Sequence, residues 1–358
     1  MLKKVDRYII KKFLGSYFFI LALIIAITVI FDINEKIDKF LDPQVPLKAI
    51  IFDYYLNFIP YFVNLFSALI TFISVIYFTS KMADNSEVIA ILSNGISFRR
   101  LMLPYMISAL FISSVTFFLN SYIIPPANVE RLNFQHTYIN NKKVTYASNV
   151  QAEVEPGIVV YFDRYDAELK RGYRFSMEKF EDKRLLSRLT AQRIEYDTAY
   201  HWVLHNYMIR DFNDMKEEIS SGTKADTTIH IMPSDFLISQ SDGEKMTNPE
   251  LREHIKRQNK RGIGNITLFE LEYAKRHSNL LASFILTIIG VSLSSRKIKG
   301  GMGLNLGIGI LLCFSYIMFS TVSSTFAISG GLSPTLAVWL PNILYAFIAV
   351  YLYRRAPR

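Results

Sequence analysis

Long uncharged runs divide this chain and predict most of its elements. The runs cover residues 13–31, 54–80, 101–129, 278–295 and 300–353. A helix that crosses a membrane needs about 20 apolar residues, so the last run must fold back once. The Ser-Gly-Gly-Leu-Ser-Pro cluster at 329–334 supplies the turn. The pattern therefore predicts an α-helical membrane protein with three spanning helices before and three after a polar block.

The polar block at 130–264 has the pattern of a β domain. Short segments rich in Tyr, Val, Ile and Phe alternate apolar with polar residues, and turn-forming residues separate them. The predicted strands cover residues 144–150, 158–163, 173–180, 185–196, 201–212 and 227–232. Evenly spaced short strands are typical of an antiparallel sandwich or open barrel. From 248 to about 261 the period is helical and Pro249 lies in the first turn, which predicts a helical strap leading back to the membrane.

The placement of charge predicts an orientation. The net charge is +9, and the basic residues outside the polar block gather at 3–12, 81–100, 296–299 and 354–358. These places alternate along the predicted spans, as cytoplasmic junctions do. We therefore expect an inner-membrane protein with both termini in the cytoplasm and residues 130–264 in the periplasm. A nucleic-acid-binding protein would instead gather Lys and Arg on one soluble domain, so nucleic acid is not an expected partner.

The sequence carries no signature of an enzyme. It has no G-x-x-x-x-G-K-[ST] motif for nucleotide phosphates and no G-x-S-x-G motif, so we expect no catalytic residue and no cofactor. His201 and His205 are four residues apart, without a carboxylate or cysteine in local register, which favours an ordinary sheet face over a metal site. The spans hold almost no ionisable side chains, which speaks against an ion-driven pump. If ATP drives this protein, a partner supplies the nucleotide site.

A short segment at about 84–95, between the second and third spans, predicts a capped helix on the cytoplasmic side. Asp84 or Ser86 can cap its first turn, and Gly95 can end it in the left-handed conformation. Glu87 complements the helix dipole. The apolar stripe consists of Val88, Ile91 and Leu92. Two interpretations fit equally: a helix that receives a mechanical push from a partner, or a helix that merely joins two spans.

The chain resembles the LptF/LptG family, the membrane subunits of the bacterial lipopolysaccharide exporter. The resemblance rests on the Val-Asp-Arg-Tyr-Ile sequence at 5–9, the segment at 86–97, the Pro-Ser-Asp-Phe sequence at 233–236 and the Trp-Leu-Pro-Asn sequence at 339–342. It implies a six-span subunit with a periplasmic β-jellyroll, and the opening residues resemble LptG more than LptF. The implied partners are lipopolysaccharide, membrane lipids, a sister permease, a cytoplasmic ABC ATPase dimer and a periplasmic jellyroll bridge protein.

The resemblance also assigns roles to particular residues. It implies that the 84–95 segment is the coupling helix and that ATPase binding falls to Glu87, Val88, Ile91, Leu92 and Gly95. The candidates for contact with the lipid headgroup are Lys36, Lys39, Arg131, Lys275 and Arg276. Lys36 and Lys39 stand among acidic residues, which departs from a plain phosphate clamp. Ordinary anchoring at the membrane interface is the alternative interpretation of Arg131, Lys275 and Arg276.

These observations combine into one domain plan and one hypothesis of function. Residues 1–129 form an N-terminal membrane half that opens with a surface helix, residues 130–264 a jellyroll-like domain with its strap, and residues 265–358 a C-terminal membrane half. The hypothesis is a permease that extracts lipopolysaccharide and passes it through the β domain, without chemistry of its own. A permease for another envelope lipid or a lipoprotein is the alternative. A membrane-embedded enzyme fits less well.

Overall fold

The structure of this chain is a computed structural model. It describes residues 3–140, 146–182, 184–213, 216–236, 242–261, 266–296 and 301–356. Some features predicted from the sequence lie outside these residues: residues 144 and 145 of the first strand, the domain boundary at 264, and the basic residues 297, 299 and 358.

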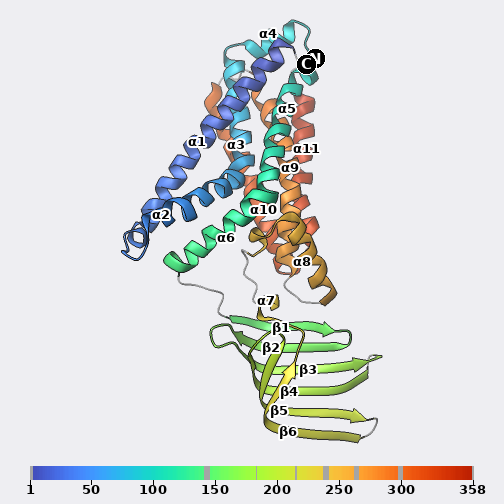
Figure 1. The fold of residues 1–358 in the computed structure, drawn as a ribbon. Helices are drawn as coiled ribbons and strands as arrows, with labels where there is room; N and C mark the ends of the chain where they lie inside the picture. The colour runs from blue at the N-terminus through green and yellow to red at the C-terminus, as the bar shows by residue number, and fades with distance from the viewer. Residues whose placement is uncertain are drawn as a thin grey trace. The chain divides into compact units, whose positions relative to one another are not determined.

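Six helices within the described ranges are long and apolar enough to cross a membrane, which confirms the predicted spans. They are α1 (Lys4–Phe40), α3 (Leu56–Asp84), α5 (Phe98–Phe118), α9 (Ile266–Ser294), α10 (Gly301–Ile328) and α11 (Pro334–Arg355). Shorter helices are α2 (Leu47–Ala49), α4 (Glu87–Ser93), α6 (Ile124–Phe134) and the π-helical turns η1 (Ile50–Tyr55), η2 (Leu119–Ile123) and η3 (Gln135–Asn140). Both termini lie at one end of the spans, beside α4 (Figure 1). We call this the terminal end, and the other the distal end.

The surface helix expected at 1–12 and the first span form one continuous helix, α1. No proline lies between Lys4 and Phe40, and Gly15 is the single glycine in that stretch. The amphipathic start therefore runs straight into the span.

The chain folds as two compact units. The membrane unit comprises Met1–Ile139, Glu244–Asn248 and Glu270–Arg358, and the β unit comprises Asn140–Gly243 and Pro249–Phe269. The segment Glu244–Asn248 thus belongs with the spans, although the residues on both sides of it belong to the β unit. The pattern of the sequence did not predict this division.

Buried polar side chains tie the spans of the membrane unit together. Asn342 of α11 donates to the carbonyl of Ser278 at 3.2 Å and to its hydroxyl at 3.1 Å, and it accepts from the Tyr316 hydroxyl at 2.9 Å. Asn305 of α10 donates to the Ser80 hydroxyl at 3.1 Å. Since the bilayer core offers no water, these bonds satisfy the polar groups internally and fix how α3, α9, α10 and α11 pack.

The β unit contains one antiparallel sheet whose strands follow their order in the sequence, β1-β2-β3-β4-β5-β6 (Figure 1). The strands are β1 (Tyr146–Glu155), β2 (Ile158–Asp166), β3 (Arg171–Glu181), β4 (Arg184–Tyr196), β5 (His201–Asn213) and β6 (Lys216–Thr228). The remaining helices are α7 (Pro233–Phe236), a 3-10 turn η4 (Gly243–Lys245) and the predicted strap α8 (Asn248–Arg261). The fold class, a helical membrane protein with an inserted β domain, is confirmed.

The last strand differs from the sequence-based prediction, which placed it at 227–232. The sixth strand is Lys216–Thr228, and residues 229–232 are irregular. Most of β6 is polar and exposed on both faces, because it lies at the edge of the sheet and pairs only with β5. A strand without an apolar face gives no alternating pattern to recognise.

The sheet curls around an apolar core on one face. Neighbouring strands lie about 4.8 Å apart, so β2 and β5 would be about 14 Å apart in a flat sheet. Yet the rings of Phe162 (β2) and Trp202 (β5) are 5.8 Å apart between centroids. Phe236 of α7 lies on the same face, with ring centroids 5.3 Å from Phe162 and 4.9 Å from Tyr165. The concave face of the sheet is therefore dry, and Phe236 of α7 covers part of it.

We predict that Gly172→Ala destabilises the β unit. A methyl group at Gly172 would lie 2.6 Å from Phe162 and 2.7 Å from Ile194, both fully buried in the curled core. Overpacking of this kind costs about 1–3 kcal/mol. At Gly222 the added methyl group meets only the outer end of Tyr207, which can swing aside, so Gly222→Ala is the matched control.

Thermal unfolding of the full-length protein checks this prediction. The chain has two tryptophans, so Trp339→Phe leaves Trp202 as the reporter of the β unit. Gly172→Ala should lower the midpoint seen by Trp202 fluorescence more than Gly222→Ala does. Equal midpoints for the two variants would contradict the packing described here.

Candidate functional site

The coupling-helix candidate, α4, presents a different face from the one its sequence predicts. The side chain of Val88 is fully buried, and Ile91 and Leu92 pack against the same core. That core is formed mainly by α1, α3 and α5 together with Val88, and it also includes Val291 of α9 and Ala356. Ile89 is 53% exposed. The apolar stripe thus packs into the chain itself, and Glu87 is half-buried. The exposed positions of α4 are Ile89, Ala90 and Ser93.

The turns on either side of α4 set its position. Gly95 ends it with φ of 80°, the left-handed conformation expected of this glycine. Ser86 precedes it with φ of 60°, and its side chain makes no capping bond. The predicted serine cap is therefore absent, because the left-handed backbone turns the Ser86 side chain away from the first turn.

Glu87 is held by side chains from two elements. Its carboxylate accepts from the Tyr8 hydroxyl of α1 at 3.0 Å and from the Asn85 amide at 3.3 Å. The guanidinium of Arg100 donates two hydrogen bonds, of 2.7 and 2.5 Å, to the buried carboxylate of Asp6, in a bidentate arrangement. These contacts fix the starts of α1, α4 and α5 relative to one another at the terminal end.

At the distal end of α1, the headgroup candidate Lys36 is engaged by a buried polar cluster. Lys36 donates to Asp32 and to the Tyr54 hydroxyl. Asp32 also accepts from Tyr54 at 3.1 Å and from Tyr55 at 3.0 Å. Lys39, one turn further, is exposed. The structure therefore separates the two lysines: Lys36 has its charge balanced inside the chain, and Lys39 faces outward.

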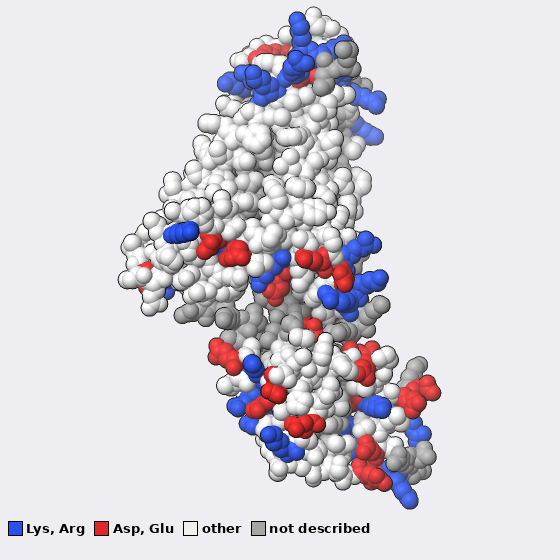
Figure 2. Space-filling view, viewed as in Figure 1, with Lys and Arg blue, Asp and Glu red and all other residues white. Residues whose placement is uncertain are grey.

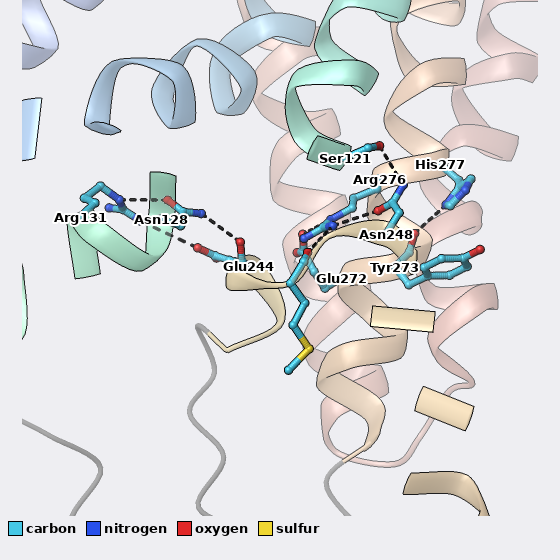
Figure 3. A network of polar contacts seen from close by, with 10 residues as sticks. Ser121, Asn128, Arg131, Glu244, Asn248, Glu272, Tyr273, Arg276 and His277 are labelled. Carbon is cyan, nitrogen blue, oxygen red and sulfur yellow. Dashed lines mark hydrogen bonds and ion pairs between the residues drawn. The ribbon is translucent and has the colours of Figure 1, made fainter. Parts of the chain in front are cut away.

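Arg131 is a second headgroup candidate, and its surroundings lie within the membrane unit (Figure 3). Only 6% of the residue is exposed. Its guanidinium donates to Asn128 at 3.1 Å, lies 3.9 Å from the Glu244 carboxylate and stacks 4.2 Å from the Tyr61 ring centroid. Asn128 in turn donates to the Glu244 carbonyl at 3.3 Å. Arg131 thus helps to hold Glu244 against α6.

Arg276 does the same for the other end of the segment Glu244–Asn248 (Figure 3). It is 2% exposed and donates to Glu272 at 2.8 Å, to the Met246 carbonyl at 2.9 Å and to the Asn248 side chain at 2.9 Å. Asn248 donates to the Ser121 hydroxyl at 2.8 Å. The two buried arginines therefore act as clamps on a five-residue segment within the membrane unit. We call this segment, Glu244–Asn248, the clasp.

A polar cavity of about 180 Å³ lies beside the clasp. Glu244, Glu272 and Lys275 line it together with side chains from α3, α6 and α9. Lys275 is half-buried and faces this cavity. Among the five headgroup candidates, Lys39 is the most exposed. Arg131 and Arg276 instead hold the chain's own backbone and side chains.

The convex face of the sheet carries charge where the concave face is dry. Glu195 accepts from Arg171 at 2.5 Å, and Arg193 and His205 lie 3.4 Å from it. Burial raises the pKa of Glu195, but the hydrogen bond and the charges of these neighbours outweigh it and hold the pKa below its ordinary value. Across the described ranges, no three His, Cys, Asp or Glu side chains come together in a way that could hold a metal ion.

Glu244 predicts a pH dependence of the clasp. Burial and then the charge of Glu272 raise the pKa of Glu244, and Arg131, Lys275 and Arg276 oppose them only in part. When a carboxyl group has a higher pKa in the folded than in the unfolded state, the free energy of unfolding falls as the pH rises through the range between the two pKa values. We expect Glu244→Gln to raise the midpoint of thermal unfolding by about 2 °C at pH 8 and to leave it unchanged near pH 4.

Thermal scans of the purified protein at both pH values measure this effect. Glu253→Gln, the same change at an exposed position of α8, is the control and should alter neither midpoint. A lower midpoint for Glu244→Gln at pH 8 would mean that the carboxylate stabilises the clasp.

Comparisons with known proteins agree with the arrangement of spans and sheet. Residues 7–355 match the family described as lipopolysaccharide export system permease LptF/LptG. That description covers both subunits, so the match does not separate LptF from LptG. A comparison with curated proteins finds no match. Because the family match extends over nearly the whole chain, this multi-pass inner-membrane protein belongs to the LptF/LptG family of lipopolysaccharide export permeases.

Proposed function

We propose that this chain moves lipopolysaccharide with energy supplied by a separate cytoplasmic ATPase dimer. It pairs with a sister permease, takes the lipid from the inner membrane and passes it along its β unit to a periplasmic bridge protein. The terminal end faces the cytoplasm and the β unit lies in the periplasm, in accord with the basic residues at the terminal end. The LptG-like identity stays a prediction from the sequence at 5–9.

The observation that carries the proposal is the way in which α4 is built into the membrane unit. Its buried stripe belongs to the same core as α1, α3 and α5, so a force on α4 is transmitted to three spans at once. Glu87 and Ile89 remain at the surface, one offering a charge and the other an apolar contact. A helix that only joined two spans would not need a carboxylate held between Tyr8 and Asn85.

The spans offer a dry wall to an amphipathic cargo. In the most apolar windows of α1 and α10 only 11% and 17% of the residues are buried, the lowest shares among the six spans. Large side chains of α10 stand exposed, among them Leu311 at 70% and Phe314 at 66%. Such surfaces suit acyl chains or the sister permease. Exposing acyl chains to water instead would cost about 0.8 kcal/mol per methylene.

The β unit has a dry surface of its own. Its concave face carries Phe162, Phe175, Trp202 and Leu204, all buried. The free edges of β1 and β6 can pair with strands of other proteins, as β-augmentation does, which suits a connection to a bridge of similar construction. Phe236 and its neighbours cover the concave face in this structure, so lipid entry requires them to move.

Co-purification tests the coupling role of Glu87. We expect Glu87→Arg to abolish retention of the ATPase, because it reverses the one charge that α4 carries. Tyr8→Phe removes one bond to Glu87 and should weaken retention about tenfold or more, as for one hydrogen bond to a charged group. Glu35→Arg, an exposed position at the distal end of α1, is the matched control. Full retention by Glu87→Arg would refute the coupling role.

Photocrosslinking in cells tests the cargo. A benzophenone amino acid at Phe314, on the exposed face of α10, is expected to capture lipopolysaccharide, whereas one at the buried Phe72 of α3 is not. Capture of a lipoprotein or of another envelope lipid at Phe314, without lipopolysaccharide, would transfer the proposal to that cargo. ATP hydrolysis by the purified chain alone would overturn the division of labour between the permease and the ATPase.

A further inference from the structure

A cavity of about 660 Å³ opens at the terminal end between α1, the end of α3 and the start of α4. Basic side chains line one part of it: Lys11 and Lys12 of α1 and Lys81 of α3. All three lysines are exposed, and none forms a salt bridge with another described residue. Figure 2 shows Lys and Arg gathered at this end, beside a broad band of the spans without charge.

The charge of the cavity is left unbalanced by its own walls. Glu87 is the single carboxylate among the lining residues, and Tyr8 and Asn85 already occupy its oxygens. Three ammonium groups against one bonded carboxylate make the site attractive to an anion. Basic pockets between spans on the cytoplasmic side are typical binding sites for the phosphates of anionic lipids.

The other part of the cavity is apolar and reaches along α1 into the span. Gly15 lies in its wall, and a side chain there would meet nothing within 4 Å. The Ser16 hydroxyl donates a hydrogen bond to the Lys12 carbonyl at 2.9 Å, so its proton is already bonded within the helix. Phe19, which is 70% exposed, also lines this part. From Lys12 to Phe19 a helix rises about 10 Å, roughly the depth from a phosphate to the upper acyl chain.

We propose that this cavity binds one anionic phospholipid of the cytoplasmic leaflet. Its phosphate lies among Lys11, Lys12 and Lys81, and one acyl chain lies along Gly15 towards Phe19. A free phosphate ion would satisfy the lysines but leave the apolar part empty, which is why the structure favours a lipid. Because Tyr8 and Glu87 share the same cavity, the bound lipid also steadies the start of α4. This inference goes beyond the proposed function, since the bound lipid is not the exported cargo.

Native mass spectrometry of the full-length protein tests the proposal without ATPase or lipopolysaccharide. The protein is loaded with phosphatidylglycerol or with phosphatidylcholine, and the retained lipid is counted. We expect retention of phosphatidylglycerol alone. Lys81→Gln should reduce its affinity about fivefold, as for one cation near the membrane surface. Gly15→Leu should reduce it by blocking the acyl path with all lysines in place. Lys48→Gln, an exposed lysine of α2 at the distal end, is the control.

Several outcomes would overturn the proposal. Equal retention of phosphatidylcholine would mean that the lysines do not select the headgroup, and unchanged affinity in Lys81→Gln and Gly15→Leu would place the lipid elsewhere. Displacement of phosphatidylglycerol by 50 mM inorganic phosphate, on the order of an ordinary buffer, would mark an ion site without an acyl component. Loss of ATPase co-purification in Lys81→Gln with unchanged lipid retention would assign the cavity to the ATPase.

Discussion

Both units of this molecule must keep large apolar surfaces away from water, and this constraint explains the arrangement of the spans and of the sheet. The spans α1 and α10 leave their apolar side chains uncovered by the chain itself, which is stable only against lipid or another protein. The sheet does the reverse and curls its apolar face around Phe162, Trp202 and Phe236. One unit thus presents a dry surface within the bilayer, and the other keeps a dry surface in an aqueous compartment.

The buried charged and amide side chains described in the membrane unit bond to other groups of the chain. Asp32 has three partners at the distal end of α1, and Asn342 has partners on α9 and α10. Arg131 and Arg276 are buried because they clamp the clasp, a segment that returns from the β unit to the spans. Since an unpaired buried charge is costly, removing one member of such a clamp would destabilise the arrangement that it holds.

The spans could be predicted from the sequence because apolar length is a strong signal, and Gly95 and Pro249 marked the end of α4 and the start of α8 correctly. The edge strand β6 could not, since it has no apolar face. The burial of Val88 depends on how α1, α3 and α5 pack around it, and α1 is distant from it in sequence. Spacing did contain one overlooked signal. Asp32 and Lys36 are four residues apart on a helix, and so are Glu272 and Arg276. This spacing predicts that each basic side chain pairs with an acidic one of the same helix and not with a lipid headgroup.

In the proposed function, acyl chains lie along the concave face of the sheet when ATP is consumed. Leu204 and Val203 are neighbours on β5, and Leu204 is buried on the concave face whereas Val203 lies on the other. Photocrosslinkers at the two positions, in a membrane preparation that contains the whole exporter and lipopolysaccharide, measure this directly. Adducts at position 204 that require ATP, with few at 203, are the predicted result. Equal adducts at both positions, or none at 204 with ATP present, would contradict the account.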